Sequence, residues 1–142
     1  MHQTEPNHFQ AFYEEDKYIH LKNYLYNYRL RKMSVEKSFR HERPELVLEE
    51  GCGISPVLKR SDRIVYSDLS FTALKILKRT HKRGCYVVAD AMHLPFKAGV
   101  FSHAVSSEVL EHLEDDHKAL KELARVLKLL GRLMVTFPHR RK

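Results

Sequence analysis

Apolar residues recur with two different periods along this chain, and their alternation predicts its architecture. Five short apolar runs have the length of buried strands, at residues 45–50, 64–67, 85–89, 103–107 and 132–137. Apolar positions three and four residues apart predict amphipathic helices at residues 71–82 and 116–128. Strands that alternate with helices at intervals of about 20–30 residues are typical of βαβ units. We therefore predict an α/β fold with a doubly wound parallel sheet.

Capping residues indicate where the second of these helices begins and ends. Asp115 or Asp116 can accept a hydrogen bond from the first helical turn. The apolar stripe of this helix stops shortly before Gly131, a residue type that commonly follows a helix. We therefore expect the helix to end at residue 128 and the last strand to begin at residue 132.

The N-terminal part of the chain has a different pattern. Residues 8–40 contain no Gly or Pro, and Leu21, Leu25 and Tyr28 recur at helical spacing, which predicts one long helix or two joined helices. Arg43 and Pro44 interrupt this pattern. We predict an N-terminal helical segment at residues 1–43 and a single compact domain at residues 44–142. The aromatic side chains of the segment either cover a ligand as a lid or pack against one face of the sheet.

Composition narrows the class of protein. With 142 residues the chain has the size of one domain, and no apolar run approaches the roughly 18 residues of a membrane span. The first twenty residues lack the basic start and apolar stretch of a secretory signal, so we expect a cytoplasmic protein. Cys52 and Cys85 are expected to be reduced thiols, and no His, Cys or acidic residues have the spacing of a metal site.

Positive charge is concentrated near the N-terminus. The chain carries a net charge of +7, and residues 17–43 hold eight Lys or Arg against two Glu. Such a segment could contact a polyanion such as RNA. A solvated helix face explains the same charges, and we favour that interpretation.

Two glycines follow the first strand, where the crevice of an open parallel sheet binds its ligand. Gly51 and Gly53 flank Cys52, so the chain can turn tightly and a ligand can approach the backbone. A dinucleotide-binding fingerprint would need a third glycine where Pro56 stands. This departure argues against a ligand that contains a pyrophosphate.

Acidic residues end the next two strands. Asp68 lies 15 residues after Gly53 and can accept hydrogen bonds from both hydroxyls of a ribose. Asp90 can accept a hydrogen bond from the exocyclic amine of adenine, and Leu69 and Met92 could sandwich the ring. These positions predict a site for an adenosine-type ligand.

Glu49 precedes the glycine turn and adds negative potential there. A carboxylate at this position favours a sulfonium or ammonium group over an anion. The expected ligand is therefore positively charged.

The order of these features resembles that of a known family. The glycine turn, Asp68 and Asp90 are followed by SSEVLEHL at residues 106–113 and by LARVLKLLGRLMVTFP at residues 123–138. Together they resemble class I S-adenosylmethionine-dependent methyltransferases, specifically the type 11 group that includes ubiquinone and menaquinone methylases. The resemblance covers about residues 44–138 and implies a Rossmann-like sheet with strand order 3-2-1-4-5. It also implies S-adenosylmethionine as the cofactor.

The resemblance also implies roles for particular residues. The stretch at 49–55 would wrap the methionine part of the cofactor, Asp68 would hold the ribose, and Asp90 and Ala91 would hold the adenine. The strand end at 106–108, which includes Ser107, would border the methyl group. In this chain Leu129 and Leu130 precede Gly131 where the family usually has Pro-Gly-Gly.

Methyl transfer does not always need a dedicated base, because the cofactor supplies the reactivity. Glu111 and His112 are the candidates, since they follow the fourth strand beside the expected methyl group. We favour a simpler interpretation, in which Glu111 is a carboxylate at a helix start and His112 is a partly exposed imidazole.

The resulting hypothesis is a methyltransferase that acts on a small-molecule acceptor. Two alternatives stay open: RNA as the acceptor, and a cofactor-binding module without catalysis. The second arises because members of the family continue with two more strands, whereas this chain stops at Lys142. We also expect a homodimer, because a sheet that ends at residues 133–137 would expose an apolar edge.

Overall fold

The computed structural model describes residues 17–58, 61–80 and 82–138. Within them the chain forms three α-helices, five strands and one short 3-10 helix. In chain order these are α2 (Lys17–Phe39), β1 (Val47–Glu50), β2 (Ile64–Asp68), α3 (Phe71–Thr80), β3 (Cys85–Val88), β4 (Phe101–Ser107), η1 (Leu110–His112), α4 (Asp116–Val126) and β5 (Leu127–Thr136).

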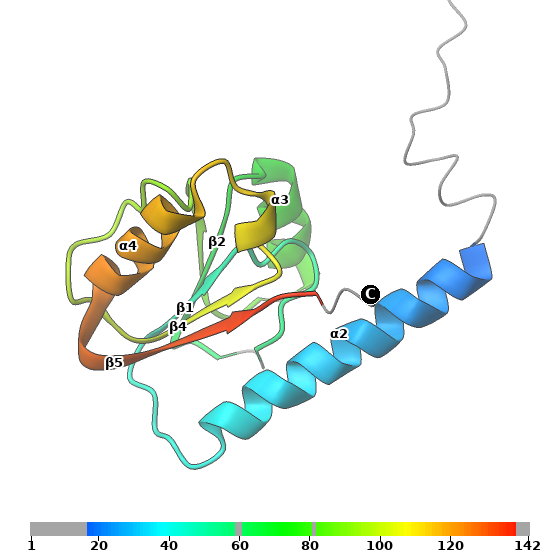
Figure 1. The fold of residues 1–142 in the computed structure, drawn as a ribbon, viewed down its shortest axis with the longest axis horizontal. Coiled ribbons are helices and arrows are strands. Elements are labelled where there is room, and N and C mark those ends of the chain that lie inside the picture. The colour runs from blue at the N-terminus through cyan, green and yellow to red at the C-terminus, as the bar shows by residue number, and fades with distance from the viewer. Residues whose placement is uncertain (1–16, 59–60, 81, 139–142) are drawn as a thin grey trace, which may run out of the picture.

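The five strands form one parallel sheet in the order β3-β2-β1-β4-β5, which confirms the predicted topology (Figure 1). The chain leaves β1 toward β2 and β3, and it later returns to place β4 on the other side of β1. The strand order therefore reverses between β1 and β4, where open α/β sheets bind ligands.

Alternate residues of each strand pack on opposite faces of the sheet. On one face Leu48 of β1 packs in a cluster with Leu123 and Val126 of α4. On the other face Val47 packs in a cluster with Leu74 and Leu77 of α3. Two apolar layers thus hold the sheet between helices, as the predicted fold requires.

Helix α2 lies along the sheet and extends past it (Figure 1). Its buried Val35 packs against Val57 and Val105 on one face of the sheet. Tyr28 donates a 2.7 Å hydrogen bond from its hydroxyl to the carbonyl of Pro56. The described part of the expected N-terminal helix is thus a single helix, and the expected start at residue 8 lies outside the described residues.

The boundary between α4 and β5 differs from the prediction. The helix ends at Val126, and Leu127 is already extended, with φ −77° and ψ 143°. Leu127 pairs with Phe101 and packs against the core, and the register then shifts so that His103 pairs with Arg132. The intervening residues bulge from the ladder, and Leu129 and Leu130 are more than 90% exposed. Gly131 therefore lies within a bulged strand and not at a helix end.

Other boundaries differ by one or two residues. Strand β1 begins at Val47, β4 begins at Phe101, and α3 ends at Thr80. No helix in the described part of the chain is long and apolar enough to cross a membrane. Cys52 and Cys85 are both free thiols.

Candidate functional site

The carboxyl ends of β1, β2 and β4 meet at one edge of the sheet and place several predicted site residues together. The turn after β1 contains Gly51 and Gly53, with φ of +68° and +53°. These left-handed conformations are strained for residues that carry a Cβ atom. No heavy atom lies within 4 Å of the position that a Cβ atom on Gly53 would occupy. The turn therefore has open space beside its backbone.

Hydrogen bonds fix this turn against the end of β2. The N–H groups of Gly51 and Cys52 donate to the carbonyl of Ser67, at 2.8 and 3.1 Å. The N–H of Gly53 donates to Asp68 Oδ2 at 2.9 Å, and Ser70 N–H donates to Asp68 Oδ1 at 2.8 Å. Asp68 thus joins the glycine turn to the loop after β2. Each carboxylate oxygen keeps a lone pair for a further donor.

Cys52 lies at the centre of the turn and is buried. Burial raises the pKa of its thiol, and the charges of Glu49 and Asp68 act in the same direction. The thiol is therefore protonated and contributes to packing under the turn.

Glu49 lies on the face of β1 that packs toward α2 and α3. Its side chain is buried, and its two oxygens accept hydrogen bonds from the N–H groups of Val57 (2.7 Å) and Leu58 (3.2 Å). Burial raises the pKa of Glu49 to about 7, while these hydrogen bonds and the charge of Lys32 oppose the shift. Glu49 therefore fixes the loop that follows the glycine turn at its other end, at Val57 and Leu58. A direct contact with the cofactor stays a prediction.

Glu50 is a buried acid that the sequence-based search did not single out. It lies on the opposite face of β1, where the register places it between Ser67 of β2 and Ser106 of β4. Ser106 donates a 2.9 Å hydrogen bond to Glu50 Oε2. Burial raises the pKa of Glu50 to about 7, and the charges of Asp68 and Asp90 add to the shift. The side chains of Glu50, Ser67 and Ser106 form a buried polar row beneath the crevice.

The sequence did contain a signal for this row. Glu50 is a second charged residue directly after Glu49, in a short strand that begins with apolar residues. Among the described residues the Ser67 hydroxyl has no hydrogen-bond partner. Burying it unpaired costs free energy of about 1–3 kcal/mol.

Asp90 begins the segment expected to hold adenine. Asp90 Oδ1 accepts a 2.9 Å hydrogen bond from Met92 N–H, and the Asp90 carbonyl accepts one from His93 N–H. Ala91 is buried, and Met92 packs against a cluster beneath it. Leu69, at the neighbouring strand end, is 72% exposed. The segment is thus held by its own backbone, with Leu69 available to a ligand.

The end of β4 forms the other wall. Ser107 and Thr136 of β5 share a 2.8 Å hydrogen bond between their hydroxyls. Val109 lies directly over the turn, since a Cβ atom on Gly51 would meet Val109 Cγ2 at 2.2 Å. Glu108 has a left-handed backbone, with φ +55°, and pairs with Arg31 of α2. The pairing of Arg31 with Glu108 joins residues 77 positions apart, so no local sequence signal identifies it.

Glu111 and His112, the candidate proton acceptors, both lie in η1. Between their side chains, Glu111 Oε1 and His112 Nε2 are 3.7 Å apart. His112 is exposed. The structure thus places both next to the end of β4, and their chemical role stays a prediction.

The arrangement suits an uncharged or cationic nucleoside ligand. Residues 49–57 contain no Lys or Arg to pair with a phosphate, and Glu50, Asp68 and Asp90 line or underlie the crevice. Asp68 offers paired acceptors beside an open turn, which is the chemistry that a ribose needs. Within the described residues no group of His, Cys, Asp and Glu could hold a metal ion.

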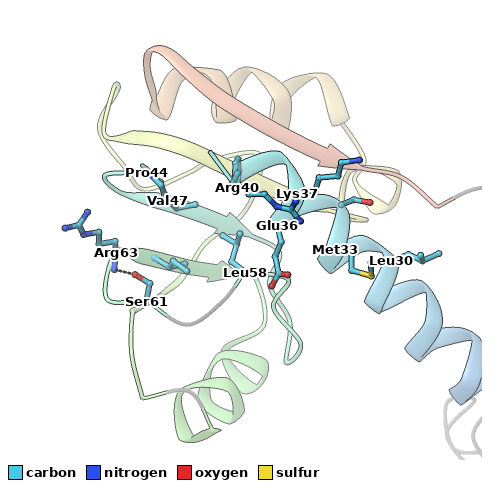
Figure 2. A pocket seen from close by; sticks show the side chains of 13 residues that line it. Leu30, Met33, Glu36, Lys37, Arg40, Pro44, Val47, Leu58, Ser61 and Arg63 are labelled. Carbon is cyan, nitrogen blue, oxygen red and sulfur yellow. Dashed lines mark hydrogen bonds between the residues drawn. The ribbon is translucent and has the colours of Figure 1, made fainter. Parts of the chain in front are cut away.

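A separate groove of about 810 Å³ lies between α2 and the amino ends of β1 and β2 (Figure 2). Leu30 and Met33 line it from α2, and Val47 and Leu58 line it from the sheet side. The groove is therefore at the end of the strands opposite the glycine turn.

Comparisons with known proteins identify the family of the chain. A family model described as a methyltransferase domain matches residues 48–135. A demethylmenaquinone methyltransferase of Thermobifida fusca is 37% identical over 100 residues, which cover 64% of this chain and 42% of that protein. A tRNA (carboxymethyluridine(34)-5-O)-methyltransferase of Arabidopsis thaliana is 29% identical over 134 residues, covering 86% of this chain and 33% of that protein.

A solved structure of similar fold contains a bound ligand. Phosphoethanolamine N-methyltransferase 2 of Haemonchus contortus, in complex with S-adenosyl-L-methionine, matches with a TM-score of 0.66 and 25% identity. The match covers 75% of this chain and 27% of that one. The chain thus spans less than half the length of each of these relatives.

Proposed function

This chain belongs to the type 11 group of class I S-adenosylmethionine-dependent methyltransferases, and from that premise we propose that it transfers a methyl group to a small-molecule acceptor. One observation carries the proposal: the hydrogen bond from Gly53 N–H to Asp68 Oδ2 joins an open glycine turn to a strand-end carboxylate. That pair forms a cradle for a ribose and the chain attached to it.

The proposed cofactor contacts follow from the positions of the strand ends. Asp68 accepts hydrogen bonds from the ribose hydroxyls through the lone pairs that its backbone partners leave free. The backbone of Gly51, Cys52 and Gly53 lies along the methionine part. Glu49 supports this loop through the bonds to its far end and adds negative potential below it.

The adenine ring is assigned to the segment after β3. Asp90 and Ala91 contact its polar edge, and Leu69 and Met92 cover its faces. The exposure of Leu69 supports this assignment, because a ring stacked on it would remove apolar surface from water.

S-adenosylmethionine supplies an electrophilic methyl group on a sulfonium, so the main task of the protein is orientation. Ser107, at the end of β4, borders the methyl group on the acceptor side. Glu111 and His112 follow in η1 and are the candidate acceptors for a proton released by the nucleophile. The acidic crevice favours the positive sulfonium.

We assign α2 the role of a lid over the methionine part. The contacts of Tyr28 with Pro56 and of Arg31 with Glu108 support this role, because they connect the helix to both walls of the crevice. In this proposal residues 44–142 form the cofactor-binding domain and residues 1–43 the N-terminal segment, whose described helix α2 covers the cofactor.

RNA is the second candidate acceptor. The Arabidopsis thaliana relative is named as a tRNA methyltransferase, and Arg29, Lys37 and Arg40 of α2 are exposed. Steep weakening of RNA binding with rising salt would favour this alternative.

The direct test is a transfer assay with methyl-labelled S-adenosylmethionine against fractionated small metabolites and total RNA. We expect label in one small-molecule fraction with the native chain, and much less label with Asp68→Asn at the same cofactor concentration. Label in RNA alone would favour the second candidate. Binding of the cofactor without transfer to any fraction would indicate a module without catalysis.

A further inference from the structure

The face of the sheet that packs against α2 and α3 is not covered along its whole length. Helix α3 packs over β2 and β3, and α2 packs over β4 through Val35 and Val105. The connection between two parallel strands usually contributes a helix to such a face. The described residues of the β1–β2 connection, 51–58 and 61–63, form turns and contain no helix. This leaves the groove between α2 and the amino ends of β1 and β2 open (Figure 2).

An exposed apolar stripe on α2 leads into this groove. Tyr26, Leu30 and Met33 are 63%, 44% and 63% exposed. Because they lie four and three residues apart, they share one face of the helix, and Leu30 and Met33 line the groove itself. The stripe and the groove thus form one apolar surface that a further segment can cover.

The groove is basic, and it contains a buried acceptor. Lys37, Arg40 and Arg63 line it and are exposed. Glu36 lines it as well, and its Oε1 is buried without a hydrogen-bond partner among the described residues (Figure 2). A buried acceptor needs a donor, which a peptide backbone has and a hydrocarbon chain lacks. The surface therefore fits a peptide segment with apolar side chains and acidic residues.

The first sixteen residues of this chain have that composition. In a chain with a net charge of +7, they contain no Lys or Arg and four acids, which are Glu5, Glu14, Glu15 and Asp16. Their aromatic residues are Phe9, Phe12 and Tyr13. The charge of this segment is thus opposite to that of the groove.

The segment is long enough to return along α2 to the groove. It joins α2 at Lys17, from which Leu30 and Lys37 lie about 20 and 30 Å along the helix at 1.5 Å per residue. An extended chain spans about 3.3 Å per residue, so Phe9 reaches about 26 Å from Lys17 and Glu5 about 40 Å. Phe9 can therefore meet Leu30 while Glu5 meets Lys37.

We propose that residues 1–16 fold back along α2 of the same molecule and dock in the groove, with Phe9 against Leu30 and Glu5 beside Lys37. A backbone N–H of the docked segment donates to Glu36 Oε1. The same face of a second copy is a poor occupant, because its cations would be repelled. The docked segment holds α2 against the sheet at the end of the strands opposite the glycine turn, and the inference does not depend on the proposed methyl transfer.

A single fluorescent reporter tests this docking in the 142-residue chain. The chain contains no Trp, so Phe9→Trp introduces the only indole. We expect acrylamide to quench this indole at least about threefold less efficiently than in a free peptide of residues 1–16 with the same substitution, because docking removes the ring from solvent. Shielding should be equal at about 0.5 and 50 µM protein, since an intramolecular contact does not depend on concentration.

Two substitutions in the groove should release the segment. Met33→Asp should expose the indole to the level of the free peptide, because it places an unpaired charge on the docking surface. Lys37→Glu should also reduce the shielding, since it repels Glu5. Leu129→Ser, on the bulge of β5, and Lys75→Glu, on the surface of α3, are the matched controls and should keep the shielding. Circular dichroism of each variant establishes that the fold is retained.

Three results would overturn the inference. In the first, the indole of Phe9→Trp alone is quenched as efficiently as that of the free peptide. In the second, the shielding persists in Met33→Asp, so that the segment packs elsewhere. In the third, the shielding is lost on dilution, which would assign the groove to the segment of a second molecule. None of these results affects the proposed methyl transfer.

Discussion

Ser106 donates a hydrogen bond of 2.9 Å to Glu50 Oε2 beneath the crevice, and both side chains are buried. The pair places an ionisable group inside the sheet, at a strand end where the protein would otherwise be expected to have an apolar side chain. Because burial raises the pKa of Glu50 to about 7, its charge changes within the ordinary working range of pH.

Glu50→Gln should change how stability depends on pH. The pKa of Glu50 in the folded state, about 7, lies above its ordinary value of 4.5. The folded state therefore keeps the proton longer, and the free energy of unfolding falls as pH rises from about 4.5 to 7. Gln cannot ionise and still accepts from Ser106. Across this pH range, the free energy of unfolding of the variant should therefore rise relative to that of the native chain by up to about 3 kcal/mol. Denaturant unfolding at several pH values measures this difference.

Glu45→Gln is the control for this series. Glu45 is exposed, and the Lys128 ammonium holds its pKa below the usual value, so its effect should have the opposite sign and be small. A difference between Glu50→Gln and the native chain that does not vary with pH would contradict the assignment.

Gly51→Ala should destabilise the protein more than Gly99→Ala. Both glycines have a left-handed backbone, with φ of +68° and +69°, so both substitutions carry a strain of about 1–2 kcal/mol. Only Gly51 has a neighbour in the way, because its Cβ atom would meet Val109. We expect an additional cost of about 1–3 kcal/mol from this clash, measured by urea unfolding. Val109→Ala in the Gly51→Ala background should recover most of it, and equal costs at the two glycines would disprove the contact.

Asp68→Asn should weaken S-adenosylmethionine binding by about tenfold to a hundredfold, because the ribose loses charge-assisted hydrogen bonds. One amide group also cannot accept from both Gly53 and Ser70. Asp62→Asn is the matched control, since Asp62 is exposed and pairs with Arg83 away from the crevice. Titration calorimetry compares the two, and unchanged affinity in Asp68→Asn would mean that the ribose lies elsewhere.

The strand pattern was sufficient to predict a parallel sheet, and the family resemblance implied its strand order. Apolar runs and glycine turns are local signals. Asp68 and Asp90 were recognised because Asp68 is the last residue of β2 and Asp90 lies two residues after β3. The end of α4 was misplaced because Leu127 leaves the helix to pair with Phe101, which is a tertiary contact. Local capping signals do not contain that information.

The residues of the site that could not be predicted from the sequence have partners far along the chain. Glu50 meets Ser106, 56 positions away, and Arg31 meets Glu108, 77 positions away. Each residue alone has the pattern of an ordinary charge, on a strand end or on a helix face. Only the fold shows which charges become buried together.

The outer edge of β5 predicts self-association. In the described part of the chain β5 pairs only with β4, and Leu133 and Phe137 are exposed beside its open edge. We expect this chain to form a homodimer through β5 at micromolar concentration, measured by light scattering. Leu133→Lys should shift it to monomer, with Lys75→Leu on α3 as a surface control. A native monomer whose β5 amides exchange rapidly with solvent would show that the edge stays open.

The central claim is that the crevice beside Gly53 and Asp68 binds S-adenosylmethionine. Titration calorimetry of the native chain with S-adenosylmethionine, its demethylated product S-adenosylhomocysteine and NAD is the most direct test. We predict that the first two bind at least about a hundredfold more tightly than NAD, because the turn offers no cation to a pyrophosphate. Equal affinity for NAD, or no binding of S-adenosylmethionine, would contradict the account.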